Sequence, residues 1–144
     1  MSRPQSAYQT TQLTGMSPGK LVEALLDGAL AATTRAIVAA EDGQTARRGE
    51  SVSKALTLVG ELQTALDLEA GDLATNLYAL YDYVQRELLE GNMRVDKKRF
   101  ENAERILGEI HEGWCEMLAV LEREQLAEAP PPEPGATSHI TDYA

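Results

Sequence analysis

An apolar side chain recurs every three or four residues from Phe100 to Leu121, and this repeat is the feature that most constrains the fold. The positions are Phe100, Ala103, Leu107, Ile110, Trp114, Met117 and Leu121. An α-helix has about 3.6 residues per turn, so this spacing places all of them on one face, whereas a strand would need alternation by two. The segment therefore predicts a long amphipathic helix, with Asp96 as its N-cap and Ala127 near its end.

A first helix is indicated by the stretch SPGKLVEALLDGAL. Ser17 is a suitable N-cap, and Pro18 fits the first turn, where a missing amide hydrogen does no harm. Apolar residues then recur at helical spacing, and we expect the helix to run to about Glu41. A second helix is predicted after Gly43, with Thr45 as its cap. Its apolar seam consists of Val52, Ala55, Val59, Leu62 and Leu66.

A third helix is predicted between two glycines. Gly71 interrupts the chain, Asp72 is a suitable N-cap, and Gly91 marks the expected end. The apolar spacing assigns its core face to Leu73, Leu77, Leu80, Val84 and Leu88.

Four amphipathic helices with connections of about four or five residues predict an all-α protein, an antiparallel four-helix bundle, because short connections make consecutive helices neighbours. We assign residues 17–127 to this bundle. Residues 1–16 carry Arg3 as their one charged side chain and are interpreted as a short N-terminal arm. Residues 128–144 contain three consecutive prolines and few apolar groups, so we expect a disordered Pro-rich C-terminal tail.

The net charge and the distribution of apolar residues restrict the classes of molecule that this protein can bind. A formal net charge of −10 disfavours binding to nucleic acid or to anionic lipid, since both rely on basic patches. The sequence has neither a secretory leader nor an apolar run near the about 20 residues that span a bilayer. These features predict a cytoplasmic protein without membrane insertion, whose partner is another protein.

The sequence does not contain a residue set typical of catalysis or of metal binding. His111 and Cys115 lie four residues apart on one helix, but two His and one Cys in the chain cannot complete a closed zinc site. A di-iron bundle needs Glu three residues before the His, and that position is Gly108. With no phosphate-binding loop either, we expect no enzyme, no metal, no cofactor and no small-molecule substrate.

The predicted helices carry more apolar surface than one seam can bury. Leu58 and Ala65 widen the apolar face of the second helix, and Leu26, Leu30 and Ile37 lie far around the first helix from its first apolar residue. Two interpretations remain open. These residues contact a second neighbouring helix, as is normal in a bundle, or they bind something outside the chain.

Several of these stretches match a known family in their order and spacing. A short Tyr-containing arm leads into SPGKLVEALLDGAL, then ALDLEAGDLATNLYALYDYVQRELLEGNMRVD follows, and Trp114 lies near the end of the last helix. Together they resemble the family of the flagellar secretion chaperone FliS. The resemblance covers about residues 8–121 and is most specific from Leu66 to Asp96. It departs from the family pattern at Leu26, where an aromatic residue is usual before Asp-Gly.

The resemblance implies an export chaperone for flagellin. The C-terminal segment of flagellin is disordered in the free subunit and helical in the filament, so the free subunit risks premature polymerisation. A chaperone of this family is expected to bind that segment in apolar grooves outside the bundle and to release it to a component of the flagellar export gate. The alternative is a structural or regulatory bundle of the flagellar system that binds another folded partner.

The candidate flagellin-binding residues come from the arm, from the surplus apolar surface and from the third helix: Tyr8, Leu13, Leu26, Leu30, Leu58, Leu62, Asn76, Leu80, Tyr81 and Tyr83. Tyr81 and Tyr83 are expected at the borders of the core face, where a ring is buried and its hydroxyl stays wet. Asn76 offers a donor and an acceptor to a peptide backbone. Packing at the bundle edge, or a local hydrogen bond for Asn76, explains these residues equally well. Tyr8 and Leu13 are hypothesised to cover the groove until flagellin displaces them.

Overall fold

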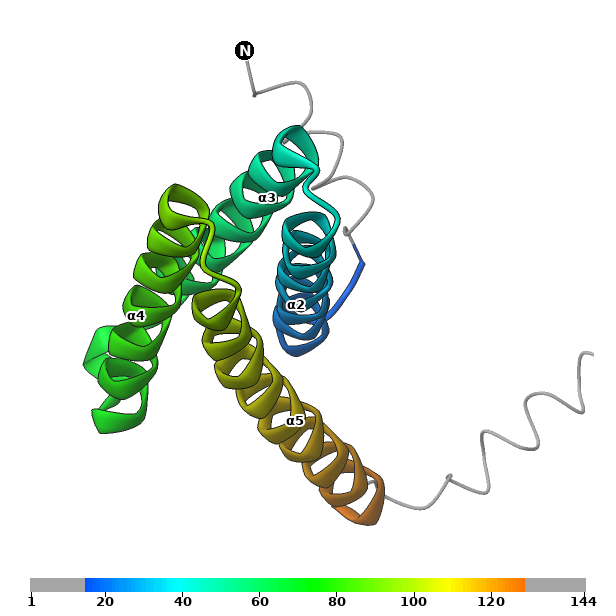
Figure 1. Ribbon diagram of the computed structural model, residues 1–144. Coiled ribbons are helices and arrows are strands. Elements are labelled where there is room, and N and C mark those ends of the chain that lie inside the picture. Colours follow the sequence, from blue (N-terminus) through cyan, green and yellow to red (C-terminus); the bar gives the residue numbers. More distant parts are fainter. Residues whose placement is uncertain (1–14, 129–144) are drawn as a thin grey trace, which may run out of the picture.

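The computed structural model describes residues 15–128, and this part of the chain is a four-helix bundle without strands (Figure 1). The four helices are α2 (Pro18–Glu41), α3 (Thr45–Thr64), α4 (Asp72–Arg94) and α5 (Lys97–Glu128). A short 3-10 helix, η1 (Leu68–Ala70), precedes α4. α2 packs against α3 and α5, and α4 packs against the same two helices. The predicted all-α four-helix bundle is confirmed, while the predicted tail and residues 1–14 of the predicted arm lie outside the described residues.

The helix ends follow the sequence signals with three differences. The N-cap of α3 is Gln44 and not Thr45, which is the first residue of the helix. The Ser17 hydroxyl accepts a hydrogen bond from the Lys20 amide at 3.2 Å, as expected of an N-cap. The N-cap of α4 is Gly71 and not Asp72, because the chain turns there with φ of 120°, a conformation that favours glycine. Gly91 does not end α4, which continues to Arg94. It is buried where α4 meets α5, and an added Cβ would lie 2.7 Å from Cε1 of Phe100.

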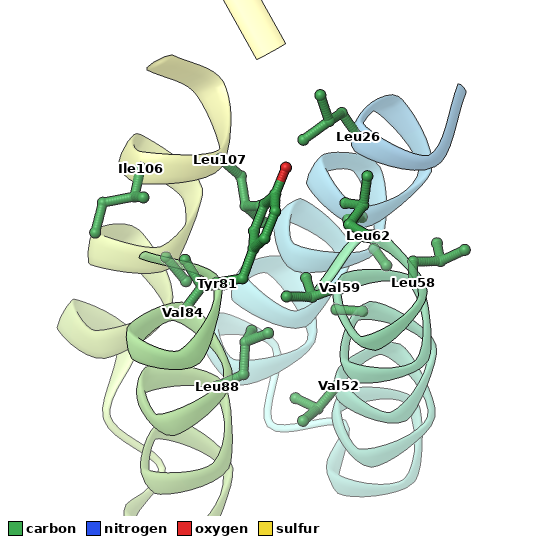
Figure 2. Close-up of a cluster of buried hydrophobic side chains, with 14 of the residues drawn as sticks. Leu26, Val52, Leu58, Val59, Leu62, Tyr81, Val84, Leu88, Ile106 and Leu107 are labelled. Carbon is green, nitrogen blue, oxygen red and sulfur yellow. The ribbon is translucent and has the colours of Figure 1, made fainter. Parts of the chain in front are cut away.

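A single hydrophobic core lies between the four helices (Figure 2). Its largest fully buried apolar side chains are Phe100, Leu26, Leu62, Leu88, Leu107, Val59 and Val84. α2 contributes mostly alanines to this core: Ala29, Ala32 and Ala36 are all 0% exposed. Small side chains let neighbouring helices approach closely, so the alanine-rich sequence of α2 suits its central position between α3 and α5.

α4 is rotated relative to the predicted core face. Tyr81, expected at a border, is 2% exposed, whereas Leu73 and Leu80, expected in the core, are 71% and 39% exposed. The reason is the course of α5, which lies beside α4 near their connection and then runs away from it (Figure 1). α5 covers one side of α4 only in its C-terminal half. The same side of the N-terminal half therefore stays uncovered.

The apolar repeat of α5 is also only partly buried. All four of its buried residues, Phe100, Ala103, Ile106 and Leu107, belong to the first third of the helix. Met117 and Leu121, predicted to continue the seam, are 38% and 44% exposed. α5 has 32 residues against 20 to 24 in the other three helices, so at about 1.5 Å per residue it extends beyond them. We call residues 115–128 the distal part of α5.

Candidate protein-binding surfaces

One side of α4 carries an uncovered stripe, which we call the open α4 stripe: Leu73, Asn76, Leu80 and Tyr83. All four side chains are exposed, and their spacing of three, four and three residues places them on one side of the helix. Glu87 follows on the same side, and there α5 does cover α4. The Glu87 carboxylate accepts hydrogen bonds from Nη1 of Arg99 and Nδ2 of Asn102, both at 3.1 Å. The stripe therefore begins where α5 leaves α4.

Four of the proposed flagellin-binding residues do not lie on any free surface. Leu26, Leu62 and Tyr81 are 0%, 2% and 2% exposed and belong to the bundle core. Their interpretation as groove residues is corrected, because each apolar face of a bundle helix contacts two neighbours and the second neighbour covers them. Leu58 is also buried, with its Cδ1 3.0 Å from the position of a Cβ on Gly28.

The other proposed residues are not gathered in one place. Leu30 is half-buried on α2 and packs against the core. Asn76, Leu80 and Tyr83 share the open α4 stripe. Tyr8 and Leu13 lie outside the described residues. The structure thus brings together the three predicted residues of α4 that remain exposed, and it separates them from those predicted on α2 and α3.

The tyrosines of α4 divide into three environments. The Tyr81 ring fills the core, with its hydroxyl directed toward the space between Leu26 and Leu107 (Figure 2). Burial raises the pKa of this hydroxyl from 10.0 to about 12. Tyr78 is 43% exposed, as expected for an outward position, and Nε2 of Gln63 donates a hydrogen bond to its carbonyl oxygen at 3.2 Å. Tyr83 remains available on the open α4 stripe.

Cys115 and His111 are neighbours on α5, but their surroundings do not favour reactivity. The Cys115 sulfur lies 3.7 Å from Nε2 of His111 and 3.6 Å from Oε1 of Glu23. Partial burial, together with the Glu23 carboxylate, raises the pKa of the Cys115 thiol above its ordinary value. The thiol therefore stays protonated at neutral pH. Only the deprotonated thiolate is an effective nucleophile or metal ligand, so this arrangement does not favour either role. Among residues 15–128, no group of three or more His, Cys, Asp and Glu side chains is arranged to hold a metal ion.

A second uncovered surface lies where the start of α2 meets the distal part of α5. Here a groove of about 400 Å³ is lined on one side by Pro18, Gly19 and Val22, and on the other by Trp114, Leu118 and Leu121. Nε1 of Trp114 donates a hydrogen bond to the carbonyl oxygen of Gly19 at 2.9 Å, which fixes the ring at the inner end of the groove. We call this surface the α2–α5 groove.

The sequence reasoning did not identify the α2–α5 groove, although one signal pointed to it. The expected fourth helix was longer than its expected partners, so part of its apolar repeat had to lack a neighbour within the bundle. None of the helices within residues 15–128 is long and apolar enough to cross a membrane.

A helical bundle with apolar stripes left uncovered on its surface belongs to the class of proteins that bind other protein chains. Comparison with known proteins defines that class further. The model of the family described as flagellar protein FliS matches residues 1–120. The flagellar secretion chaperone FliS of Salmonella typhimurium is 43% identical over 100 residues, 68% of this chain and 74% of that protein.

Two further relatives carry the same name. The flagellar secretion chaperone FliS of Escherichia coli is 38% identical over 104 residues, 71% of this chain and 76% of that protein. The one of Bacillus subtilis is 27% identical over 118 residues, 82% of this chain and 88% of that protein. The chain belongs to the flagellar protein FliS family. Membership of this family, a chaperone family and not an enzyme family, supports a chaperone role in flagellar export that acts on a protein partner.

Proposed function

We propose that this chain is a cytosolic, non-enzymatic export chaperone that binds the disordered C-terminal segment of flagellin along the open α4 stripe. The observation that carries the proposal is the stripe itself. Leu73, Leu80 and Tyr83 expose apolar side chains on the side of α4 that α5 leaves uncovered, and the exposed Asn76 lies between them. An amphipathic helix can bury its apolar face against such a stripe, where it would take the place that α5 occupies farther along α4.

The binding mode follows from the chemistry of the stripe. Leu73 and Leu80 contribute apolar area, Tyr83 adds a ring with a polar tip, and the Asn76 amide can pair with backbone groups of the bound segment. Ordering a disordered segment costs several kcal/mol, so the contact must be long and apolar to compensate. Binding would keep flagellin from polymerising in the cytosol, and a component of the flagellar export gate would then receive it.

The test is calorimetry against a synthetic peptide of the flagellin C-terminus. The variant Asn76→Ala/Tyr83→Ala should weaken binding by about tenfold or more while the far-UV circular dichroism and the melting curve stay nearly unchanged, because both side chains are exposed. Tyr78→Ala is the matched control, since Tyr78 is an equally large residue exposed on the other side of α4. Normal binding by the double variant would contradict the assignment of the stripe.

The same experiment addresses the alternative function. A structural or regulatory bundle that binds another folded partner would show no measurable heat with the flagellin peptide, either as the unmodified chain or as any variant. Such a result would refute flagellin binding itself, whereas a loss seen equally in the double variant and in Tyr78→Ala would refute only its placement on the open α4 stripe.

A further inference from the structure

The charged residues of the described part of the chain are divided between the two ends of the bundle. One end holds the α2–α3 and α4–α5 connections, which Nε of Arg48 links through a hydrogen bond to Oδ1 of Asn92 at 3.0 Å. Residues 35–54 and 86–105, which form this end, contain ten Lys or Arg and eight Asp or Glu, a net charge of +2. The remaining described residues contain two Lys or Arg and thirteen Asp or Glu, a net charge of −11. The end that carries the α2–α5 groove is therefore strongly acidic.

The acidic charges lie beside apolar side chains of the distal part of α5. Met117, Val120 and Leu121 are 38%, 42% and 44% exposed. Glu122, a lining residue of the groove, and Glu124 lie next to them in the sequence. Lys20 is the basic residue at the rim, and its ammonium already faces Glu23 at 3.3 Å and Glu122 at 3.9 Å. The result is an apolar groove with an excess of negative charge around it.

We propose that the α2–α5 groove is a second docking site, and that it binds an amphipathic helix of a partner protein with basic residues beside its apolar face. The apolar face would cover Trp114, Met117 and Leu121, and the basic residues would face the glutamates at the rim. The site uses residues separate from the open α4 stripe, so it goes beyond flagellin binding there.

Charge complementarity distinguishes this occupant from three alternatives. Residues 129–144 of the chain contain Glu133 and Asp142 but no Lys or Arg, so like charges oppose their docking in the groove. A second copy of the chain would bring the same acidic end against itself. Anionic lipid surfaces are repelled for the same reason. A basic amphipathic helix is the partner that gains from both the apolar area and the charge.

Trp114 is the single tryptophan of the chain and lines the groove, so its fluorescence reports on this site alone. The probe is a synthetic helix of leucine and lysine, about five turns long, without aromatic residues. We expect it to shift the Trp114 emission to shorter wavelength, with an affinity that falls as salt is added. A matched peptide with glutamate in place of lysine should not bind. Equal binding of the two peptides, or binding that leaves the Trp114 emission unchanged, would overturn the proposal.

Variants of the protein locate the site. Met117→Gln/Leu121→Gln should weaken binding of the leucine-lysine peptide by about tenfold or more, and Glu122→Gln/Glu124→Gln should reduce the salt dependence. Met93→Gln is the matched control, because Met93 is 80% exposed at the opposite, basic end of the bundle. An equal loss in the Met93 variant would show nonspecific adsorption and overturn the proposal.

Two further measurements separate this site from the other functions of the surface. The variant Asn76→Ala/Tyr83→Ala should bind the leucine-lysine peptide normally, so that failure of flagellin binding and failure of this site are distinguished. Sedimentation of the free chain should show a monomer. A dimer that Met117→Gln/Leu121→Gln dissociates would assign the groove to a second copy and refute the proposed occupant.

Discussion

Nε1 of Trp114 donates a hydrogen bond to the carbonyl oxygen of Gly19 at 2.9 Å, and this contact joins the middle of α5 to the first turn of α2. The two residues are far apart in the sequence, and their pairing holds the start of the distal part of α5 in place. No residue of α5 from Gly108 to Glu128 is buried. The contact therefore anchors this less covered part of α5 to α2.

The first prediction concerns this hydrogen bond. Trp114→Phe removes the donor and part of the ring, and should lower the free energy of unfolding by about 1 to 2 kcal/mol. Urea denaturation followed by circular dichroism measures the change without requiring the indole as a probe. An unchanged denaturation midpoint would show that the contact contributes nothing to stability.

The second prediction compares two helical glycines. Gly91→Ala places a Cβ 2.7 Å from Cε1 of the buried Phe100 ring, and should destabilise the fold by about 1 to 3 kcal/mol. Gly60→Ala meets no atom within 4 Å and should stabilise α3 by about 0.5 to 1 kcal/mol, because alanine is the better helix former. Thermal unfolding of the two variants should shift in opposite directions. Equal shifts would contradict the close contact of α4 with α5.

The third prediction concerns the core. Leu107 is 0% exposed, so Leu107→Ala should cost about 2 to 5 kcal/mol of unfolding free energy. Leu77 was also expected at the centre of a seam, but it is half-buried on the less covered half of α4. Leu77→Ala should therefore cost less, about 1 to 2 kcal/mol. Equal costs in chemical denaturation would show that α5 covers α4 along its whole length.

The fourth prediction follows from the buried hydroxyl of Tyr81. Its pKa of about 12 in the folded state lies above the ordinary value of 10.0, so the unfolded chain loses this proton first as the pH rises. The stability that burial of the neutral group provides is complete below pH 10 and is lost as the pH rises through about 12. Tyr81→Phe should therefore resist alkaline unfolding better than the unmodified chain, by about 3 kcal/mol at most. Identical alkaline denaturation curves would show that Tyr81 ionises normally.

The fifth prediction concerns the N-terminal arm. If Tyr8 and Leu13 cover part of the flagellin-binding surface in the free protein, deletion of residues 1–14 should tighten binding of the flagellin peptide, because a displaced segment lowers apparent affinity. The deletion should also lower the melting temperature and promote self-association through the uncovered apolar surface. A truncated chain that stays monomeric, melts as before and binds the peptide no better would show that the arm covers nothing.

The sequence alone determined the number, type and approximate limits of the helices. Spacing by three and four residues is a local property of the sequence. A capping residue such as Ser17 likewise indicates the start of a helix whatever the helix packs against. The same local signals failed at Gly91, which looks like a stop in sequence but acts as the small residue against which Phe100 packs. Only the position of the neighbouring helix distinguishes those two roles.

The tertiary structure decided which apolar residues remain available to a partner. Tyr81 and Leu80 are adjacent in sequence, and the periodicity places Leu80 on the core face and Tyr81 at its border, yet Tyr81 is 2% exposed and Leu80 is 39% exposed. Their difference depends on how α4 is rotated and on where α5 diverges from it, and neither is encoded in the periodicity of a single helix. The physical reason is that an amphipathic pattern defines a face about half a turn wide, whereas exposure is set residue by residue by the neighbours that pack against that face.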